Sequence, residues 1–204
     1  MNDISRLIRT GTLAILCVSL VWGCAEKPAQ VTDQALQAIQ AAKEAGAMEY
    51  APEDLRLAED EYQKAQEEIT TQDNAFVLTR NYDGAKTILT KVVTNAEQAK
   101  TKALANKQQA KSDAEAAVIL AKSTLEEAKN RLSQAPKGKG TQADIQALHG
   151  DLQAAETTLA EIDPILAKED FLGVKAKAES VLALATRVNE QVAHAMQKAG
   201  KVKA

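Results

Sequence analysis

Aromatic and chain-breaking residues are scarce in this sequence. Aromatics make up 3% of the 204 residues, and the chain has nine glycines and four prolines. A β-sandwich or β-barrel needs more aromatic and β-branched residues with frequent turns, and an α/β nucleotide-binding fold needs strands between its helices. The composition speaks against these classes. Alanine, the strongest helix former, occurs 39 times, so the sequence predicts an all-α protein.

Neither sign of charge dominates the chain. The 25 Lys and Arg residues stand against 28 Asp and Glu residues, for a formal net charge of −3, and the two signs are interspersed. A nucleic-acid-binding surface or a polybasic membrane patch would need a local excess of basic residues. We therefore expect no nucleic-acid partner.

No hydrophobic run is long enough to cross a membrane as a helix. Leu13–Trp22 contains ten residues with only Ser19 polar. A bilayer core of about 30 Å needs about 20 helical residues. The run follows Arg6 and Arg9 and has the length of the apolar region of a secretory signal.

The run ends in Val21-Trp22-Gly23-Cys24, which resembles the lipobox of bacterial lipoproteins, although Trp22 stands where a small residue is usual. The resemblance implies that residues 1–23 are a removed signal peptide and that Cys24 is the lipid attachment residue, which carries palmitate. Ala25 follows the cysteine in place of Asp. In such lipoproteins this implies the inner leaflet of the outer membrane, facing the periplasm.

The cysteine count agrees with acylation. Cys17 lies in the segment that would be removed, so the mature chain would keep one cysteine, which cannot form an internal disulfide. Acylation would remove this exposed thiol. The alternative is that Cys24 is an incidental thiol after an ordinary signal peptide or a weak membrane anchor.

The rest of the chain contains a duplicated pattern of three helices. Apolar residues recur at three- and four-residue intervals, which is typical of one buried helix face. In the first copy they are Val31, Ala35, Ala38, Ala42 and Ala45; Leu55, Ala58, Tyr62, Ala65, Ile69 and Phe76; and Tyr82, Ala85, Leu89, Val92, Ala96, Ala99 and Ala103. In the second, at offsets of 90, 90 and 89, they are Ala121, Leu125, Ala128, Leu132 and Ala135; Ile145, Leu148, Leu152, Ala155, Leu159, Ile162 and Leu166; and Phe171, Val174, Ala178, Val181, Ala185, Val188 and Val192.

This internal repeat predicts two tandem three-helix units in an elongated antiparallel bundle of coiled-coil type. We place them at 24–107 and 118–204, with a helical linker at 108–117. Residues 104–113 contain no glycine or proline, so one continuous helix is expected from about 82 to 134, roughly 80 Å long.

Polar residues and prolines mark the expected helix ends. Asn81 and Asp170 are predicted N-caps, and Pro52 with two following acids is a predicted helix start. Pro164 should kink the helix or restart it after Asp163.

Two segments of the first unit resemble an uncharacterised family of bacterial envelope lipoproteins, a domain of unknown function. They are Tyr50-Ala51-Pro52-Glu53-Asp54-Leu55, which has the family's Tyr-Ala-Pro-acid-x-Leu pattern, and Asn81-Tyr82-Asp83-Gly84-Ala85, an aromatic turn before an Ala-rich helix. The similarity covers residues 40–105, and Gly140-Thr141-Gln142 replaces the Tyr-Ala-Pro segment in the second unit. It implies an envelope lipoprotein and no particular chemistry.

No catalytic, cofactor-binding or metal-binding pattern stands out. His149 and His194 lie on different predicted helices and are expected to be solvated or at an interface, and Gly138-Lys139-Gly140 follows no strand that would make it a phosphate loop. Acidic clusters such as Glu59-Asp60-Glu61 are expected on outward helix faces. Aromatic side chains, Phe76 among them, are expected to fill the thin ends of an alanine core. We therefore expect no enzyme, cofactor or small-molecule substrate.

These features favour a lipid-anchored spacer, scaffold or protein–protein adaptor at the cell envelope, joined to the membrane through Cys24 and to an unidentified envelope protein. The alternative is a chaperone-like module that holds a client peptide or lipid in an apolar groove between helices. A covalent link to peptidoglycan is disfavoured, because the chain ends in Ala204 and not in lysine.

Overall fold

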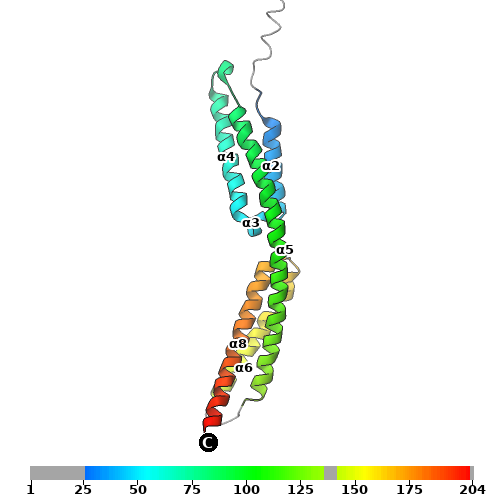
Figure 1. Ribbon diagram of the computed structural model, residues 1–204, viewed down its shortest axis with the longest axis vertical. Helices are drawn as coiled ribbons and strands as arrows, with labels where there is room; N and C mark the ends of the chain where they lie inside the picture. Colours follow the sequence, from blue (N-terminus) through cyan, green and yellow to red (C-terminus); the bar gives the residue numbers. More distant parts are fainter. Residues whose placement is uncertain (1–25, 136–141, 203–204) are drawn as a thin grey trace, which may run out of the picture. The chain divides into compact units, whose positions relative to one another are not determined.

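The computed structural model describes residues 26–135 and 142–202 (Figure 1). Within these ranges the chain is a helical bundle without strands, as the composition predicts. The elements are α2 (Ala29–Glu44), α3 (Ala47–Tyr50), α4 (Pro52–Asn74), the short 3-10 helix η1 (Val77–Thr79), α5 (Asp83–Ser133), α6 (Gln142–Ala160), α7 (Ile162–Leu166) and α8 (Phe171–Val202). The chain divides into two compact units between Leu104 and Ala105, within α5.

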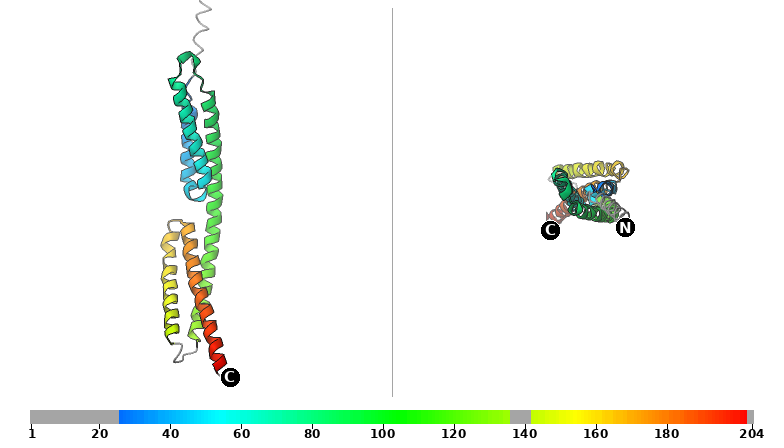
Figure 2. Two further views of the ribbon diagram at one scale, coloured as in Figure 1. Left: turned by 90° about the vertical axis from the view of Figure 1, so that its left-hand side faces the viewer. Right: turned by 90° about the horizontal axis from the view of Figure 1, so that it is seen from above.

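The first unit contains α2, α3, α4, η1 and the first part of α5, and Figure 2 shows its three long helices side by side. Ion pairs give their directions. Lys27 pairs with Asp73 and Lys43 with Glu59, both at 2.6 Å, so α2 and α4 are antiparallel. Asn95 of α5 donates a hydrogen bond to Glu61 at 2.6 Å.

The second unit contains the rest of α5 with α6, α7 and α8. Arg187 of α8 pairs with Asp151 of α6 at 2.6 Å, and Lys177 pairs with Glu161 at 2.5 Å, so α6 and α8 are antiparallel. Lys129 joins α5 to Glu156 of α6 at 2.9 Å.

The predicted face of the third helix in each unit is confirmed throughout. All seven matched pairs of residues are buried: Tyr82 with Phe171, Ala85 with Val174, Leu89 with Ala178, Val92 with Val181, Ala96 with Ala185, Ala99 with Val188, and Ala103 with Val192. Among the described residues no polar or charged residue is buried. Each core is therefore held by apolar packing, and its many alanines let the helix backbones approach closely.

The other predicted faces are confirmed in large part. In α2 the residues Ala35 and Ala42 are buried, but Ala38 is only half-buried and Ile39 is buried in addition. Burying Ile39 removes more apolar area from water than burying Ala38 does. In α4, Tyr62 is half-buried.

Phe76 and Leu166 were predicted in the core, and both predictions are wrong. Their exposed fractions are 70% and 41%. Helix α4 ends at Asn74, and Ala75 is extended with φ −74° and ψ 160°, so the periodicity no longer applies at Phe76. Leu166 is the last residue of α7, a five-residue helix that begins after a break.

The continuous helix predicted for about 82–134 is present as α5, which has 51 residues. Within 104–113 only Ala110 is buried. This segment is helical although few of its side chains pack.

One N-cap, Asp170, and one helix start are confirmed, whereas Asn81 lies one residue before the N-cap position of α5, which Tyr82 occupies because its carbonyl accepts the Lys86 N–H. The Asp83 backbone N–H donates to Asn81 Oδ1 at 2.8 Å, and the Gly173 N–H donates to Asp170 Oδ1 at 2.7 Å. Each bond satisfies one of the N–H groups that lack a partner within the helix. Helix α4 begins at Pro52, whose missing N–H costs nothing at this position.

The break at Pro164 differs from the prediction. The helix was expected to restart after Asp163, but α6 ends at Ala160 and α7 starts at Ile162, so Pro164 is the third residue of α7. Proline lacks an N–H and its ring clashes with the carbonyl four residues earlier, which here belongs to Ala160. The helix therefore breaks at that carbonyl.

The connection between α2 and α4 contains one helical turn, α3. Gly46 precedes it with φ +85°, a left-handed conformation that favours glycine. The turn at Gly138-Lys139-Gly140 lies outside the described residues.

Candidate functional site

Cys24, the predicted lipid attachment residue, and the segment 1–23 lie outside the described residues. The first described residue is Glu26. Lys27 follows Cys24 by three residues and lies just before α2. The end of the first unit that contains Lys27 is therefore the part of the structure that the chain joins to Cys24.

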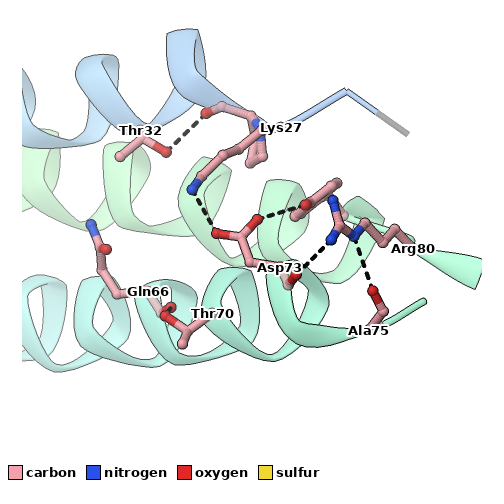
Figure 3. Close-up of polar contacts among 9 residues, drawn as sticks. Lys27, Thr32, Gln66, Thr70, Asp73, Ala75 and Arg80 are labelled. Carbon is pink, nitrogen blue, oxygen red and sulfur yellow. Dashed lines mark hydrogen bonds and ion pairs between the residues drawn. The ribbon is translucent and has the colours of Figure 1, made fainter. Parts of the chain in front are cut away.

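This end contains a hydrogen-bonded network around Asp73, in the last turn of α4 (Figure 3). Lys27 Nζ lies 2.6 Å from Asp73 Oδ2, and the Tyr82 hydroxyl donates to Asp73 Oδ1 at 2.7 Å. Lys27 lies just before α2, Asp73 lies in α4, and Tyr82 lies just before α5. The network therefore ties the three helices of the unit together at one end.

The contacts shift the pKa of all three groups. Hydrogen bonds from Lys27 and then from Tyr82 lower the pKa of Asp73. The hydrogen bond to Asp73 raises the pKa of Lys27 and also that of Tyr82. Asp73 is thus held ionised and Lys27 protonated, so the network holds an ion pair and is not arranged for proton transfer.

Arg80 and Gln72 shape the chain between α4 and α5. Arg80 Nε donates to the Ala75 carbonyl at 3.1 Å, and its Nη2 donates to the Asp73 carbonyl at 2.7 Å. Gln72 Oε1 accepts a hydrogen bond from the Asn81 N–H at 3.0 Å. These bonds satisfy backbone groups at the end of α4 and give the connection a defined shape.

The connection carries three consecutive exposed apolar residues, which we call the 76–78 tip. Phe76, Val77 and Leu78 are 70%, 48% and 76% exposed. Thr79 closes η1, because its N–H and its hydroxyl both donate to the Phe76 carbonyl, at 2.8 and 2.9 Å. The tip is thus an apolar projection on a hydrogen-bonded backbone.

The equivalent connection of the second unit keeps one exposed apolar residue, Leu166, which matches Phe76, and is charged from Lys168 onward. Residues 167–170 read Ala-Lys-Glu-Asp, and Glu169 adopts φ +57°. Glu169 pairs with Lys107 at 2.7 Å, which lowers the pKa of the Glu169 carboxyl, and the Lys107 ammonium lies 6.0 Å from the centre of the Phe171 ring. The apolar tip is therefore a property of the first unit and not of the repeat.

The exposed tip was not predicted, because the apolar periodicity placed Phe76 in the helix core. A signal was present in the sequence. Residues 74–79 read Asn-Ala-Phe-Val-Leu-Thr, an uncharged run that interrupts the three- and four-residue spacing, whereas the matching stretch of the second unit is charged.

The residues considered for other chemistry are on the surface. His149 and His194 are exposed. In the acidic cluster, Asp60 faces Arg56 at 3.8 Å, while Glu59 and Glu61 hold the partners in α2 and α5 given above. Within the described ranges no group of His, Cys, Asp and Glu is arranged to hold a metal ion.

A shallow hollow lies on the surface of α5, lined by Thr94, Glu97, Gln98, Thr101 and Lys102. All five residues are exposed and come from one helix. The hollow is therefore a surface depression on one helix and not a cleft between helices.

None of the helices in the described part of the chain has both the length and the hydrophobicity needed to span a bilayer. Comparisons with protein-family models, with curated proteins and with solved structures found no match for this chain. The resemblance to envelope lipoproteins stays a prediction from the sequence.

Proposed function

We propose that this protein is a lipoprotein of the bacterial cell envelope that is attached to the membrane through Cys24 and acts as a structural spacer, scaffold or adaptor between proteins. The observation that carries the proposal is the sequence from Leu13 to Cys24, where a short apolar run ends in a lipobox-like segment. The preferred location is the inner leaflet of the outer membrane, because Ala25 follows the cysteine.

The helical units support a role in holding or joining rather than in chemistry. Their cores are apolar, and several of their exposed charges form ion pairs across neighbouring helices, such as Lys43 with Glu59 and Arg187 with Asp151. Surface pairs of this kind contribute little to stability, about 0 to 1 kcal/mol each. They leave long polar helix faces on which a partner protein can bind.

The anchor is tested by replacing Cys24. We expect Cys24→Ser to abolish acylation, so that the protein either appears in the soluble periplasmic fraction or stays as uncleaved precursor. Fractionation of cells and mass spectrometry of the N-terminal peptide measure both outcomes. Ser112→Cys is a control that adds an exposed thiol and should leave the membrane fraction unchanged. A cleaved Cys24→Ser protein that still needs detergent for extraction would contradict the proposal.

The adaptor role is tested by crosslinking intact envelopes and recovering the lipidated protein. An envelope protein that is crosslinked to the wild type in its native membrane supports the role. The client-binding alternative predicts instead that the native protein binds a hydrophobic dye such as ANS in an interhelical groove.

A further inference from the structure

The 76–78 tip exposes apolar side chains that the fold does not need for its core. Scattered exposed apolar residues are ordinary on a protein surface, but contiguous ones mark interaction sites. Here three neighbours project from one hydrogen-bonded turn, and residues 74–79 carry no charge. Such a surface is suited to an apolar environment.

The tip lies at the end of the first unit that leads to Cys24. The ion pair of Lys27 with Asp73 holds residue 27 against the last turn of α4, and Asp73 precedes the tip by three residues (Figure 3). Cys24 precedes Lys27 by three residues, and a span of that length covers at most about 11 Å when fully extended. An acyl chain on Cys24 would thus be tethered close to the tip.

We propose that the 76–78 tip inserts into the headgroup and acyl boundary of the leaflet that holds the lipid on Cys24, as a second membrane contact. The proposal rests on the proposed function, because it requires the lipid on Cys24. A tethered lipid gives the tip a high effective concentration at the bilayer, so a small apolar surface is sufficient for it to insert.

The backbone and the charges around the tip suit this position. The Phe76 carbonyl accepts two hydrogen bonds from Thr79, so insertion leaves it satisfied. Lys27 and Arg80 are the cations nearest the tip among the residues of its network, and they would be available to anionic headgroups at the membrane surface. Asp73 faces both of these cations and is held by them.

The repeat provides an internal comparison. The two units share seven matched buried pairs in their third helices, yet among the described residues three consecutive large exposed apolar side chains occur at this position in the first unit and one, Leu166, in the second. At the offset of 90 that matches Phe76 with Leu166, the second unit has Leu166, Ala167 and Lys168 there, so it keeps one exposed large apolar residue, Leu166, and has a charge in place of Leu78. A feature needed for folding would be expected in both units, whereas a membrane contact is needed only beside the anchor.

The test uses tryptophan as a reporter in the mature lipoprotein. The single Trp of the sequence, Trp22, lies in the predicted signal peptide, so Phe76→Trp would be the sole tryptophan of the mature chain. The lipidated protein is reconstituted into vesicles of phosphatidylethanolamine and phosphatidylglycerol, with and without bromine on the acyl chains. Ile119→Trp is the matched control, because Ile119 and Phe76 are both 70% exposed.

We expect the Phe76→Trp protein to show blue-shifted emission that is quenched by brominated lipid, and the Ile119→Trp protein to show neither change. Leu78→Trp, at a second tip position, should behave like Phe76→Trp. Both tip sites are exposed, so these variants are expected to fold, which circular dichroism checks.

Two results would overturn the proposal and are distinguishable from failure of the anchor. Emission as in water for both tip variants, with an acyl mass on Cys24, means that the tip does not contact the bilayer. Blue-shifted emission without bromine quenching means that a protein surface, such as a second copy of this chain, covers the tip. If mass spectrometry finds no acyl group on Cys24, the proposed function itself fails, and this inference fails with it.

Discussion

Alanine and a few larger aliphatic residues make different contributions to the packing of each unit. Fully buried alanines such as Ala96 and Ala185 bring helices close but bury little area each, so the larger side chains supply much of the hydrophobic stabilisation. Leu89 and Val92 are completely buried in the first unit, as are Val181 and Val188 in the second. Truncation of one of these side chains should therefore lower the free energy of unfolding substantially.

Leu89→Ala tests this at a single position. We expect it to lower the free energy of unfolding by about 2 to 5 kcal/mol, because it removes apolar contacts and leaves a cavity. Lys91→Ala, at an exposed position two residues away in the same helix, should change stability by no more than about 0.5 kcal/mol. Chemical denaturation followed by circular dichroism measures both, and equal effects would contradict the assignment of the buried face.

The Asp73 network predicts a dependence of stability on pH. Because the folded state lowers the pKa of Asp73, its contribution is present above the ordinary carboxyl pKa and is lost as the pH falls through the lowered value. We expect Asp73→Asn to destabilise the protein at neutral pH and to lose less stability than the wild type on acidification.

Thermal unfolding of both proteins at neutral and acidic pH measures the difference. Comparison with the wild type cancels the contributions of Asp113 and Glu169, whose carboxyl pKa values are also lowered by neighbouring hydrogen bonds. Asp60→Asn serves as a control. It also removes a carboxylate from α4, but one that faces Arg56 at 3.8 Å and does not belong to the Asp73 network. If Asp73→Asn and the wild type respond to acid alike, the network does not stabilise the fold.

At the scale of elements, α5 is the feature that the two units share. It contributes core residues to the first unit up to Ala103 and to the second from Ala110 onward. Between them, Leu104 is 52% exposed and the neighbouring residues are polar or small. The helix is therefore maintained here by its intrinsic propensity and by the packed segments on either side.

Hydrogen exchange tests this view of α5. We expect backbone amides of residues 104–113 to exchange faster than those around Val92 and Leu125, because local opening exposes little apolar surface there. All three regions belong to one helix, so the type of backbone hydrogen bond is the same throughout. Protection of 104–113 equal to that of the two cores would show that another surface covers this segment.

At the scale of the molecule, duplication has kept the packing of the units and changed their ends. The matched pairs of α5 and α8 stay buried, while the connection after the second helix is apolar in one unit and charged in the other. Removal of residues 1–23 would change the net charge from −3 to −4, because Arg6, Arg9 and Asp3 are lost. The position of the apolar tip, at the end of the first unit that leads to Cys24, agrees with the membrane contact proposed above.

The sequence by itself determined the helical class, the duplicated core pattern, the N-cap at Asp170, and the continuity of α5. These properties depend on residue spacing and on interactions within a few positions, which periodicity and capping rules describe. The proposed lipid on Cys24 was inferred from sequence alone and stays a prediction.

Only the tertiary structure decided where helices end and what their ends expose. Arg80 and Gln72 hold the chain after Asn74 in a non-helical shape that brings Phe76 to the surface, and the ion pair of Lys27 with Asp73 joins residues 46 positions apart. Such contacts depend on the distances between packed helices, and rules based on neighbouring residues in the sequence do not predict these distances. For that reason the periodic pattern located the cores, whereas the apolar tip beside the attachment end became visible only in three dimensions.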